Sequence, residues 1–312
     1  MDKKQFTHPI IKGIRHKKIL PAGTALVLEG GGTRGFYSAG VFEAFMDEGI
    51  MFPYIVGVSA GAANALTYIS GQQGRSRQIV EHYVGNKKYV SRRNLLRYGT
   101  LFGYDFIFNT VPNQHIFWDK EIFDITNIRF VTGATNCSTG EAVWFEKDEM
   151  TDGFIETIAS CSVPIVAKIV KHKGMELLDG GIAAPIPIEK SVADGNNFHV
   201  IVLTRNAGFL QRPFKRKNFL KLFYKKYPKF VDTMMKRHEI YNRQLALCEK
   251  LEQEQKAIII RPQQPLVVGR STSDVGKLLE LYDQGHSEGA EAVVKLKKFF
   301  EKRDCILFDS KV

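Results

Sequence analysis

The stretch from residue 24 to residue 66, TALVLEGGGTRGFYSAGVFEAFMDEGIMFPYIVGVSAGAANAL, decides the fold of this chain. An apolar run leads through a glycine turn at 30–35 into an amphipathic segment that stops at Gly49. A second apolar run, at 51–58, leads through another tight turn into an alanine-rich segment that stops at Gly71. Strand, turn and helix repeated in this order are typical of a parallel sheet covered by helices. We therefore predict an α/β fold with a mainly parallel central sheet.

The remaining apolar runs extend this pattern along the chain. Further strands are expected at 128–136, 141–147, 175–181, 198–205 and 257–262. A short helix is expected at 152–161. These runs are short enough for strands of one sheet, so we expect them to join the sheet that 24–58 begins.

The last third of the chain has apolar residues at helical spacing over 228–255 and 273–300. We expect Ser273 to cap the second of these helices, and Gly285 or Gly289 to break it. The sequence shows no internal repeat and no long linker. We therefore predict an N-terminal basic segment at 1–23 and a catalytic core at 24–205. A basic amphipathic segment with a C-terminal extension, at 206–312, completes the same domain.

The composition is that of an ordinary globular protein, with 44% hydrophobic and 25% charged residues among 312. The four cysteines are far apart, which argues against a disulfide framework or a zinc knuckle and suits a reducing compartment. The sequence shows no signal-peptide core, and no apolar run approaches the roughly 20 residues of a membrane span. These features predict a cytoplasmic protein. We expect no metal or other cofactor.

The net charge of +11 is concentrated in two stretches that contain no acidic residue, 195–231 and 82–104. Within 212–230, aromatic side chains alternate with eight cationic ones; the aromatics are Phe214, Phe219, Phe223, Tyr224, Tyr227 and Phe230. Such a segment is typical of a helix that lies on an anionic membrane surface. A helix packed on the core with a basic outer face is the alternative, and no nucleic-acid-binding motif accompanies the charge. We therefore expect no nucleic-acid partner.

The glycine turn fits the pattern G-x-G-x-x-G through Gly30, Gly32 and Gly35, which raises the question of a dinucleotide site. That site also requires an acidic residue after the second strand, and none occurs between Ile50 and Glu81. The same loop can serve as an oxyanion hole, since glycines expose backbone N–H groups at a helix N-terminus. The candidate donors are Gly30, Gly31, Gly32, Thr33, Arg34 and Ala60.

Ser59 lies in a Gly-x-Ser-x-Gly frame between the second apolar run and the alanine-rich segment. A serine on such a strand-to-helix turn is held exposed at the C-terminal edge of the sheet. Because the glycine loop follows the neighbouring strand, both turns are expected at the same edge, where open α/β sheets bind ligands. Ser59 is therefore the candidate nucleophile.

A serine hydroxyl needs a base, and Asp179 is the best candidate because it ends an apolar strand and precedes two glycines. An aspartate is a weak base, so burial would have to raise its pKa. The alternative is a Ser-His-Asp triad, as in α/β-hydrolases, in which His199, His238 or His286 joins Asp179. An Asp-Gly-Gly turn without a catalytic role also remains open.

Taken together, residues 30–35, 57–61 and 179–181 resemble the motifs of the patatin-like phospholipases, which are lipid acyl hydrolases with a serine–aspartate dyad. The resemblance covers roughly 24–205. It implies a three-layer α/β/α fold, Ser59 as nucleophile, Asp179 as base, the glycine loop as oxyanion hole, and no metal. Segment 158–168 is similar to the family's Ala-Ser-x-Ala-x-Pro loop but has Ser162 in place of alanine, which leaves the shape of the acyl pocket open.

The resulting prediction is a lipid acyl hydrolase of the phospholipase A or lysophospholipase type that works through an acyl-enzyme. Its partners would be a phospholipid or another lipid ester and the peripheral surface of an anionic membrane. Two alternatives remain, namely an esterase with a Ser-His-Asp triad and a non-catalytic membrane-binding protein. The sequence leaves the oligomeric state open.

Overall fold

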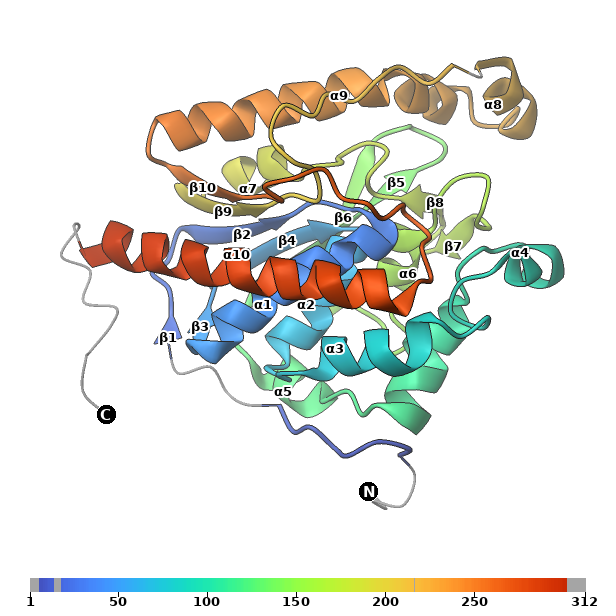
Figure 1. The fold of residues 1–312 in the computed structure, drawn as a ribbon. Coiled ribbons are helices and arrows are strands. Elements are labelled where there is room, and N and C mark those ends of the chain that lie inside the picture. Colours follow the sequence, from blue (N-terminus) through green and yellow to red (C-terminus); the bar gives the residue numbers. More distant parts are fainter. Residues whose placement is uncertain (1–5, 14–17, 216, 302–312) are drawn as a thin grey trace.

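The computed structural model describes residues 6–13, 18–215 and 217–301. Parts of the predicted N-terminal segment and of the C-terminal extension, 1–5, 14–17 and 302–312, lie outside these residues. The chain folds around one large sheet with helices on both of its faces (Figure 1).

The large sheet has the strand order β10-β9-β2-β4-β5-β8-β7, with β6 paired to β5 off this path. Neighbours from β10 to β5 are parallel, whereas β6, β7 and β8 run antiparallel to their partners. The strands are β2 (Thr24–Leu28), β4 (Tyr54–Val58), β5 (Arg129–Asn136), β6 (Ala142–Glu146), β7 (Val170–His172), β8 (Met175–Asp179), β9 (Phe198–Val202) and β10 (Ala257–Ile260). The mainly parallel sheet predicted from the sequence is confirmed.

Two helical layers cover the sheet (Figure 1). One layer contains α1 (Phe36–Asp47), α2 (Ala60–Ile69) and α10 (Val275–Glu301), and the other contains α7 (Ile188–Ala193) and α9 (Pro228–Gln253). Both helical layers are needed because successive side chains of a strand point to opposite faces of the sheet, and the side chains of β2 are apolar on both faces. Leu26 and Leu28 pack into the cluster on the α1 side, and Ala25 and Val27 pack into the cluster on the α9 side. The three-layer arrangement is confirmed.

The remaining elements are short. They are β1 (Lys18–Ile19), β3 (Ile50–Met51), η2 (Gly32–Gly35), α3 (Arg75–Ile79), η3 (Val80–Val84), α4 (Arg92–Tyr98), η4 (Phe106–His115), α5 (Lys120–Ile125), η5 (Lys147–Glu149), α6 (Ile155–Cys161) and α8 (Lys217–Phe223). Strands β1 and β3 form a small parallel pair beside the main sheet. None of the helices within the described ranges combines the length and the apolar character needed to cross a bilayer.

The prediction for the last helix is wrong in two respects. Helix α10 runs without a break through both of its central glycines. A Cβ at Gly285 would overlap the carbonyl oxygen of Tyr37, so this glycine lets α10 approach the backbone of α1 closely. Low helix propensity suggested a break, but the packing of two helices overrides it. The helix also begins after Asp274, whose Oδ1 accepts the Lys277 amide at 3.2 Å, and Ser273 therefore lies one residue before the cap.

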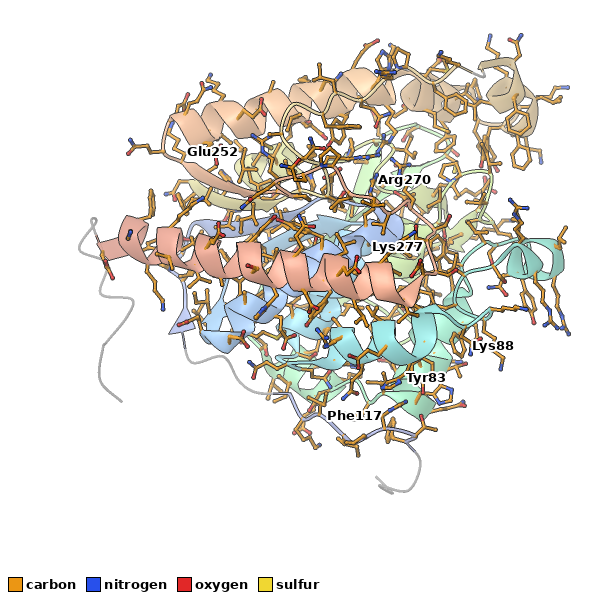
Figure 2. All side chains as sticks on the ribbon, viewed as in Figure 1. Tyr83, Lys88, Phe117, Glu252, Arg270 and Lys277 are labelled. Atoms are coloured by element: carbon orange, nitrogen blue, oxygen red, sulfur yellow. The ribbon has the colours of Figure 1, made fainter. Side chains whose placement is uncertain are left out.

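The last third of the chain packs on the same sheet as the first two thirds. Strand β10 pairs with β9 at one edge, α10 covers α1, and α9 lies across the opposite face. The segment that connects β10 with α10 contains Arg270 (Figure 2). This connection returns to the glycine loop after β2, which brings it to the site described next.

Candidate active site

Ser59 occupies the turn between β4 and α2 in a backbone conformation that serine rarely adopts. Its φ of 53° and ψ of −131° lie in a region that costs an L-residue about 1–3 kcal/mol. Flanking glycines let the turn close, because a Cβ on Gly57 would lie 2.9 Å from the Ala62 amide nitrogen and one on Gly61 2.8 Å from the Glu29 carbonyl oxygen. The turn therefore fixes the hydroxyl at the end of β4.

Asp179 reaches Ser59 because of the way in which β5 pairs with its two neighbours. Val58 pairs with Gly133 across β4 and β5, and Ala134 pairs with Asp179 across β5 and β8. The ends of β4 and β8 therefore lie at adjacent positions along β5. The Ser59 hydroxyl donates a hydrogen bond of 2.8 Å to Asp179 Oδ2, and both side chains are buried.

The end of α6 and the turn after β8 hold both side chains in place. The Ser160 hydroxyl accepts the Ser59 amide at 2.8 Å. The Asp179 amide donates to the Ser162 carbonyl at 2.9 Å, and the Gly181 amide donates to Asp179 Oδ1 at 2.7 Å. Each carboxylate oxygen of Asp179 therefore accepts a hydrogen bond, which fixes the orientation of the group.

Ser160 and Ser162 received no individual role from the sequence. Only the resemblance of 158–168 to a family loop pointed to this segment. The Ser162 hydroxyl, which stands where the family has alanine, donates back to the Ile158 carbonyl at 2.8 Å. Its polar atom is thus satisfied within its own helix.

Burial is the largest influence on Asp179, and it raises the pKa of the carboxyl group. The hydrogen bonds from Ser59 and Gly181 and the charges of Arg270 and Arg237 lower this pKa, but they do not cancel the effect of burial. A carboxylate with a raised pKa is a stronger base than a solvated aspartate. The environment therefore supplies the property that Asp179 lacks as a free side chain.

The three histidines considered for a triad lie away from this pair. Their ring nitrogens contact other groups. A ring nitrogen of His199 lies 3.0 Å from the Ser191 hydroxyl, and one of His238 lies 3.0 Å from the Met235 carbonyl oxygen. A ring nitrogen of His286 lies 2.6 Å from the Asp47 carboxylate. Within the described parts of the chain, no imidazole is hydrogen-bonded to Ser59 or Asp179. A triad through these histidines is therefore wrong, since the hydroxyl contacts the carboxylate directly.

The glycine loop after β2 lies between the Ser59 turn and the segment before α10. A Cβ at Gly32, whose φ is +59°, would overlap the carbonyl oxygen of Arg270. The same carbonyl accepts the Thr33 amide at 2.9 Å, so this amide is committed to the contact. Ala60 begins α2, where the first amides of a helix have no intrahelical acceptor. The other candidate donors are the amides of Gly30, Gly31, Gly32 and Arg34.

The Arg34 side chain is buried behind the loop, with 3% of its surface exposed. It lines neither of the cavities that open at Ser59. Burial lowers the pKa of Arg34 to about 10, and the nearby charge of Glu29 offsets part of this effect. This placement favours a side chain that supports the loop rather than one that contacts a substrate.

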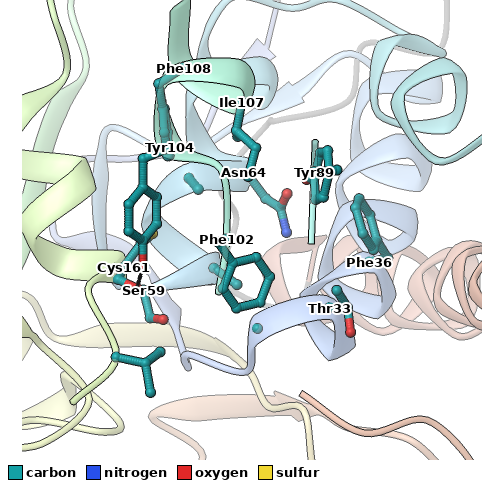
Figure 3. Close-up of a pocket in the computed structure, with 14 residues that line it drawn as sticks. Thr33, Phe36, Ser59, Asn64, Tyr89, Phe102, Tyr104, Ile107, Phe108 and Cys161 are labelled. Carbon is teal, nitrogen blue, oxygen red and sulfur yellow. Dashed lines mark hydrogen bonds between the residues drawn. The ribbon is translucent and has the colours of Figure 1, made fainter. Parts of the chain in front are cut away.

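A largely apolar cavity of about 80 Å³ opens at Ser59 and is shown in Figure 3. Its walls contain no charged side chain and include Phe36, Tyr89, Phe102, Tyr104, Ile107 and Phe108. The Tyr104 hydroxyl donates to the Cys161 carbonyl at 2.7 Å, drawn as a dashed line in Figure 3. A neighbouring cavity of about 70 Å³ has six wall residues in common with the first cavity and extends to Trp118 and Phe154. Together they form a largely apolar path that starts at Ser59 and has one charged side chain in its wall, Arg75, whose guanidinium donates to the Phe117 and Ile116 carbonyls and to the Thr67 hydroxyl.

A second cavity, of about 250 Å³, opens at Ser59 on the side of Asp179 and the glycine loop. It meets the apolar cavity at Gly32, Ser59, Phe102 and Val163. Arg237 and Arg270 line it, and sequence reasoning assigned neither of them. Both lie in the last third of the chain, in segments without a recognisable motif, and only the tertiary fold brings them to the site. Groups of three or more His, Cys, Asp or Glu side chains that could hold a metal ion do not occur among the described residues.

Comparisons with known proteins identify the family of this chain. The family model described as patatin-like phospholipase matches residues 26–191, and a model described as a domain of unknown function (DUF6363) matches residues 227–301. The chain is 27% identical over 212 residues to the uncharacterized protein YjjU of Escherichia coli (strain K12), covering 63% of this chain and 56% of the relative. It is 24% identical over 299 residues to lysophospholipase nte1 of Aspergillus terreus, covering 90% of this chain and 19% of that protein. The chain therefore spans about half and about a fifth of the lengths of these two curated relatives.

Among solved structures, VipD from Legionella pneumophila aligns with a TM-score of 0.45 and 14% identity, over 95% of this chain and 72% of that chain. The human GIVD cytosolic phospholipase A2 aligns with a TM-score of 0.43 and 14% identity, over 89% and 59% of the two chains. Likenesses at this level carry no inference about function. The family model, in contrast, covers more than half of the chain and includes both Ser59 and Asp179. The chain belongs to the patatin-like phospholipase family.

Proposed function

We propose that this protein hydrolyses lipid esters through an acyl-enzyme, with Ser59 as nucleophile and Asp179 as general base. The observation that carries the proposal is the direct hydrogen bond of 2.8 Å between the two side chains at the mouth of an apolar path. Membership of a lipid hydrolase family and similarity to proteins named lysophospholipase support it.

In the first half of the reaction, Asp179 takes the hydroxyl proton as Ser59 Oγ attacks the ester carbonyl carbon. The carbonyl oxygen becomes an oxyanion, for which the amides of the glycine loop, apart from that of Thr33, and the amide of Ala60 are the donors. When the intermediate collapses, the bond to the leaving alkoxide breaks, and the alkoxide receives the proton from Asp179. The products of this half are a free alcohol and an acyl ester on Ser59.

In the second half, Asp179 takes a proton from water as the water oxygen attacks the acyl-enzyme. Collapse of the second intermediate returns the proton to Ser59 Oγ and releases the fatty acid. A positioned base contributes about 10²–10⁴-fold, and one oxyanion donor contributes roughly 2.7–4 kcal/mol. Much of the acceleration therefore comes from the preorganised amides and from positioning of the substrate.

The test is labelling with a fluorophosphonate, which reacts with activated serines, together with hydrolysis of a palmitoyl monoglyceride. Ser59→Ala is expected to abolish both, and Asp179→Asn is expected to lower hydrolysis by about 10²-fold or more. Ser138→Ala and Asp148→Asn are matched controls because both residues are exposed and neither lines the cavities that open at Ser59. Labelling that persists in Ser59→Ala, or full hydrolysis in Asp179→Asn, would contradict the proposal.

We also propose that α8, with the α4 region, attaches the protein to an anionic membrane surface. The apolar residues of the basic segment divide into two groups. Leu220, Tyr224 and Phe230 are buried in a core cluster, whereas Phe219, Leu222 and Phe223 are exposed at 45%, 78% and 56%. Lys221, Lys225 and Lys226 accompany the exposed group.

Helix α4 has the same character, with Leu96 at 89% and Tyr98 at 53% exposure beside Arg92, Arg93 and Arg97. Both α4 and α8 project from the same side of the molecule in Figure 1. Exposed apolar side chains among cations suit an interfacial helix, because the apolar groups enter the lipid while the cations contact headgroup phosphates.

A further inference from the structure

The cavity on the Asp179 side is lined by charged side chains, whereas the apolar cavity that it meets at Ser59 is not. Two guanidinium groups line it, and one carboxylate, that of Asp179, faces them. Both oxygens of that carboxylate already accept hydrogen bonds, from Ser59 and from the Gly181 amide. The cavity therefore has an excess of positive charge.

Arg237 lies on α9, and its contact with the described part of the chain is through Nε. Its Nε donates to the Gly181 carbonyl at 2.6 Å, beside the turn that holds Asp179. This contact holds Nε beside Gly181, and the two terminal nitrogens have no hydrogen-bond acceptor among the described residues. Within the described residues, no carboxylate forms an ion pair with Arg237.

Arg270 is anchored through its backbone rather than through its side chain. Its carbonyl accepts the Thr33 amide at 2.9 Å, which fixes the residue against the glycine loop. Its side chain is exposed and lines the cavity. No ion pair to a carboxylate involves this guanidinium in the described parts of the chain either. Neither guanidinium forms an ion pair within the described residues, although the charges of Asp179 and Glu29 act on Arg237. Two such groups on one cavity are typical of a site for a phosphate.

We propose that Arg237 and Arg270 bind the phosphodiester of a phospholipid or lysophospholipid on the leaving-group side of the ester. This inference rests on the proposed function. In such a lipid, the acyl chain and the phosphate lie on opposite sides of the ester bond. With the ester at Ser59, the acyl chain occupies the apolar path and the phosphate lies in the arginine-lined cavity. The protein therefore prefers esters with an anionic headgroup over neutral glycerides.

The two arginines also give the C-terminal third of the chain a role in the site. The patatin-like model ends at residue 191, and both arginines lie within the segment 227–301 matched by the domain of unknown function. That segment contributes α9 and α10 to the fold and, in this inference, the groups that select the substrate.

The test compares kcat/KM for palmitoyl lysophosphatidylglycerol and for palmitoyl monoglyceride, each diluted in micelles of a neutral detergent. Arg270→Gln and Arg237→Gln are each expected to lower the ratio of the two values by about tenfold, since a hydrogen bond to a charged group is lost only for the phosphate-bearing lipid. Both substrates use Ser59 and Asp179, so an effect of either arginine on these residues cancels in the ratio.

Arg243→Gln is the matched control, because Arg243 lies on α9, is exposed, and pairs with Glu189. It removes one positive charge without touching the cavity, and the ratio is expected to stay at the wild-type value. A ratio that does not fall in Arg270→Gln, whose backbone contact is kept, would overturn the inference even if Arg237→Gln failed to fold. A wild-type protein that hydrolyses the monoglyceride and not the lysophospholipid would overturn it as well. If the protein hydrolysed neither of the two lipids, the proposed function would be overturned, and this inference with it.

Discussion

Residues 24–205 and residues 206–301 both reach the site, but they do so by different means. The first part brings the hydroxyl, the carboxylate and the loop amides through turns that follow single strands, so each group belongs to a short motif. The second part brings Arg237 from the middle of a long helix and Arg270 from a connecting segment. The comparison suggests that the reacting groups are encoded locally, whereas the charge around them depends on long-range packing.

The contact between the two parts can be broken at Gly32. In Gly32→Ala the new Cβ would overlap the Arg270 carbonyl oxygen, and the backbone φ of +59° would be strained. The glycine loop then has to move away from the segment before α10, which misaligns the proposed oxyanion donors. We expect kcat/KM for the monoglyceride to fall by roughly 10²–10³-fold.

Gly49→Ala is the control for the strain alone, since Gly49 has a φ of +65° and no atom within 4 Å of a new Cβ. It is expected to lower stability slightly and to leave kcat/KM near the wild-type value. Equal activities of the two variants would show that the contact with Arg270 does not position the loop.

The packing of the second part on the first can be tested at Gly285. In Gly285→Ala the Cβ would overlap the Tyr37 carbonyl oxygen and push α10 away from α1. Overpacking of this kind costs about 1–3 kcal/mol in the free energy of unfolding. Urea denaturation monitored by circular dichroism measures the loss.

Gly276→Ala serves as the control because it lies in the same helix and its Cβ would meet no atom closer than 3.5 Å. Alanine has the higher helix propensity, so this variant is expected to be as stable as wild type or more stable by up to about 1 kcal/mol. If Gly285→Ala were equally stable, the close approach of the two helices would not require glycine.

The same contrast explains which features the sequence could predict. Periodicity predicted the central strands and the helices α1, α2, α6, α9 and α10, but not the short elements β1, β7, α3, α4, α5 and α7. The resemblance of three ordered motifs predicted Ser59 and Asp179 as a pair, and the two side chains are in contact. The unbroken course of α10 was missed, because the close neighbour that Gly285 accommodates, Tyr37, is far away in the sequence. Arg237 was missed for the same reason, since an arginine on a helix with charges of both signs has no local feature that separates it from a solvated one.

The surface proposal extends the comparison, because α4 comes from the first part and α8 from the second. Replacing Leu222 and Phe223 together by serine removes exposed apolar area that would enter the lipid. We expect the partition coefficient on vesicles with anionic phosphatidylglycerol to fall by about tenfold. Leu96→Ser in α4 is expected to lower it by a smaller factor, since only one side chain is lost.

Val294→Ser is the control, since Val294 is half exposed on α10. Vesicle co-sedimentation measures all of these variants, and neutral vesicles show the contribution of charge. Unchanged binding of the α8 double variant, or equal binding of the wild type to anionic and neutral vesicles, would refute attachment through this surface.

The smallest expected effect concerns pH, and it separates two roles of the arginines. Burial raises the pKa of Asp179, and the charges of Arg270 and Arg237 lower it. In the proposed reaction the base has to be deprotonated, so kcat/KM for the monoglyceride rises with pH. The midpoint of this ascending limb of the pH profile is expected above the ordinary pKa range of an aspartate. Removing a positive charge disfavours the carboxylate, and Arg270→Gln is therefore expected to move this limb to higher pH, by less than about one pH unit because Arg270 is exposed.

Salt and a second variant control this prediction. The shift should be smaller in 0.5 M salt than in 0.05 M salt, because the screening length is roughly threefold shorter. Arg243→Gln should not move the limb. A limb that moves to lower pH would mean that Asp179 is not the group that titrates, whereas a limb that stays in place would leave headgroup binding as the only part for Arg270 in the reaction.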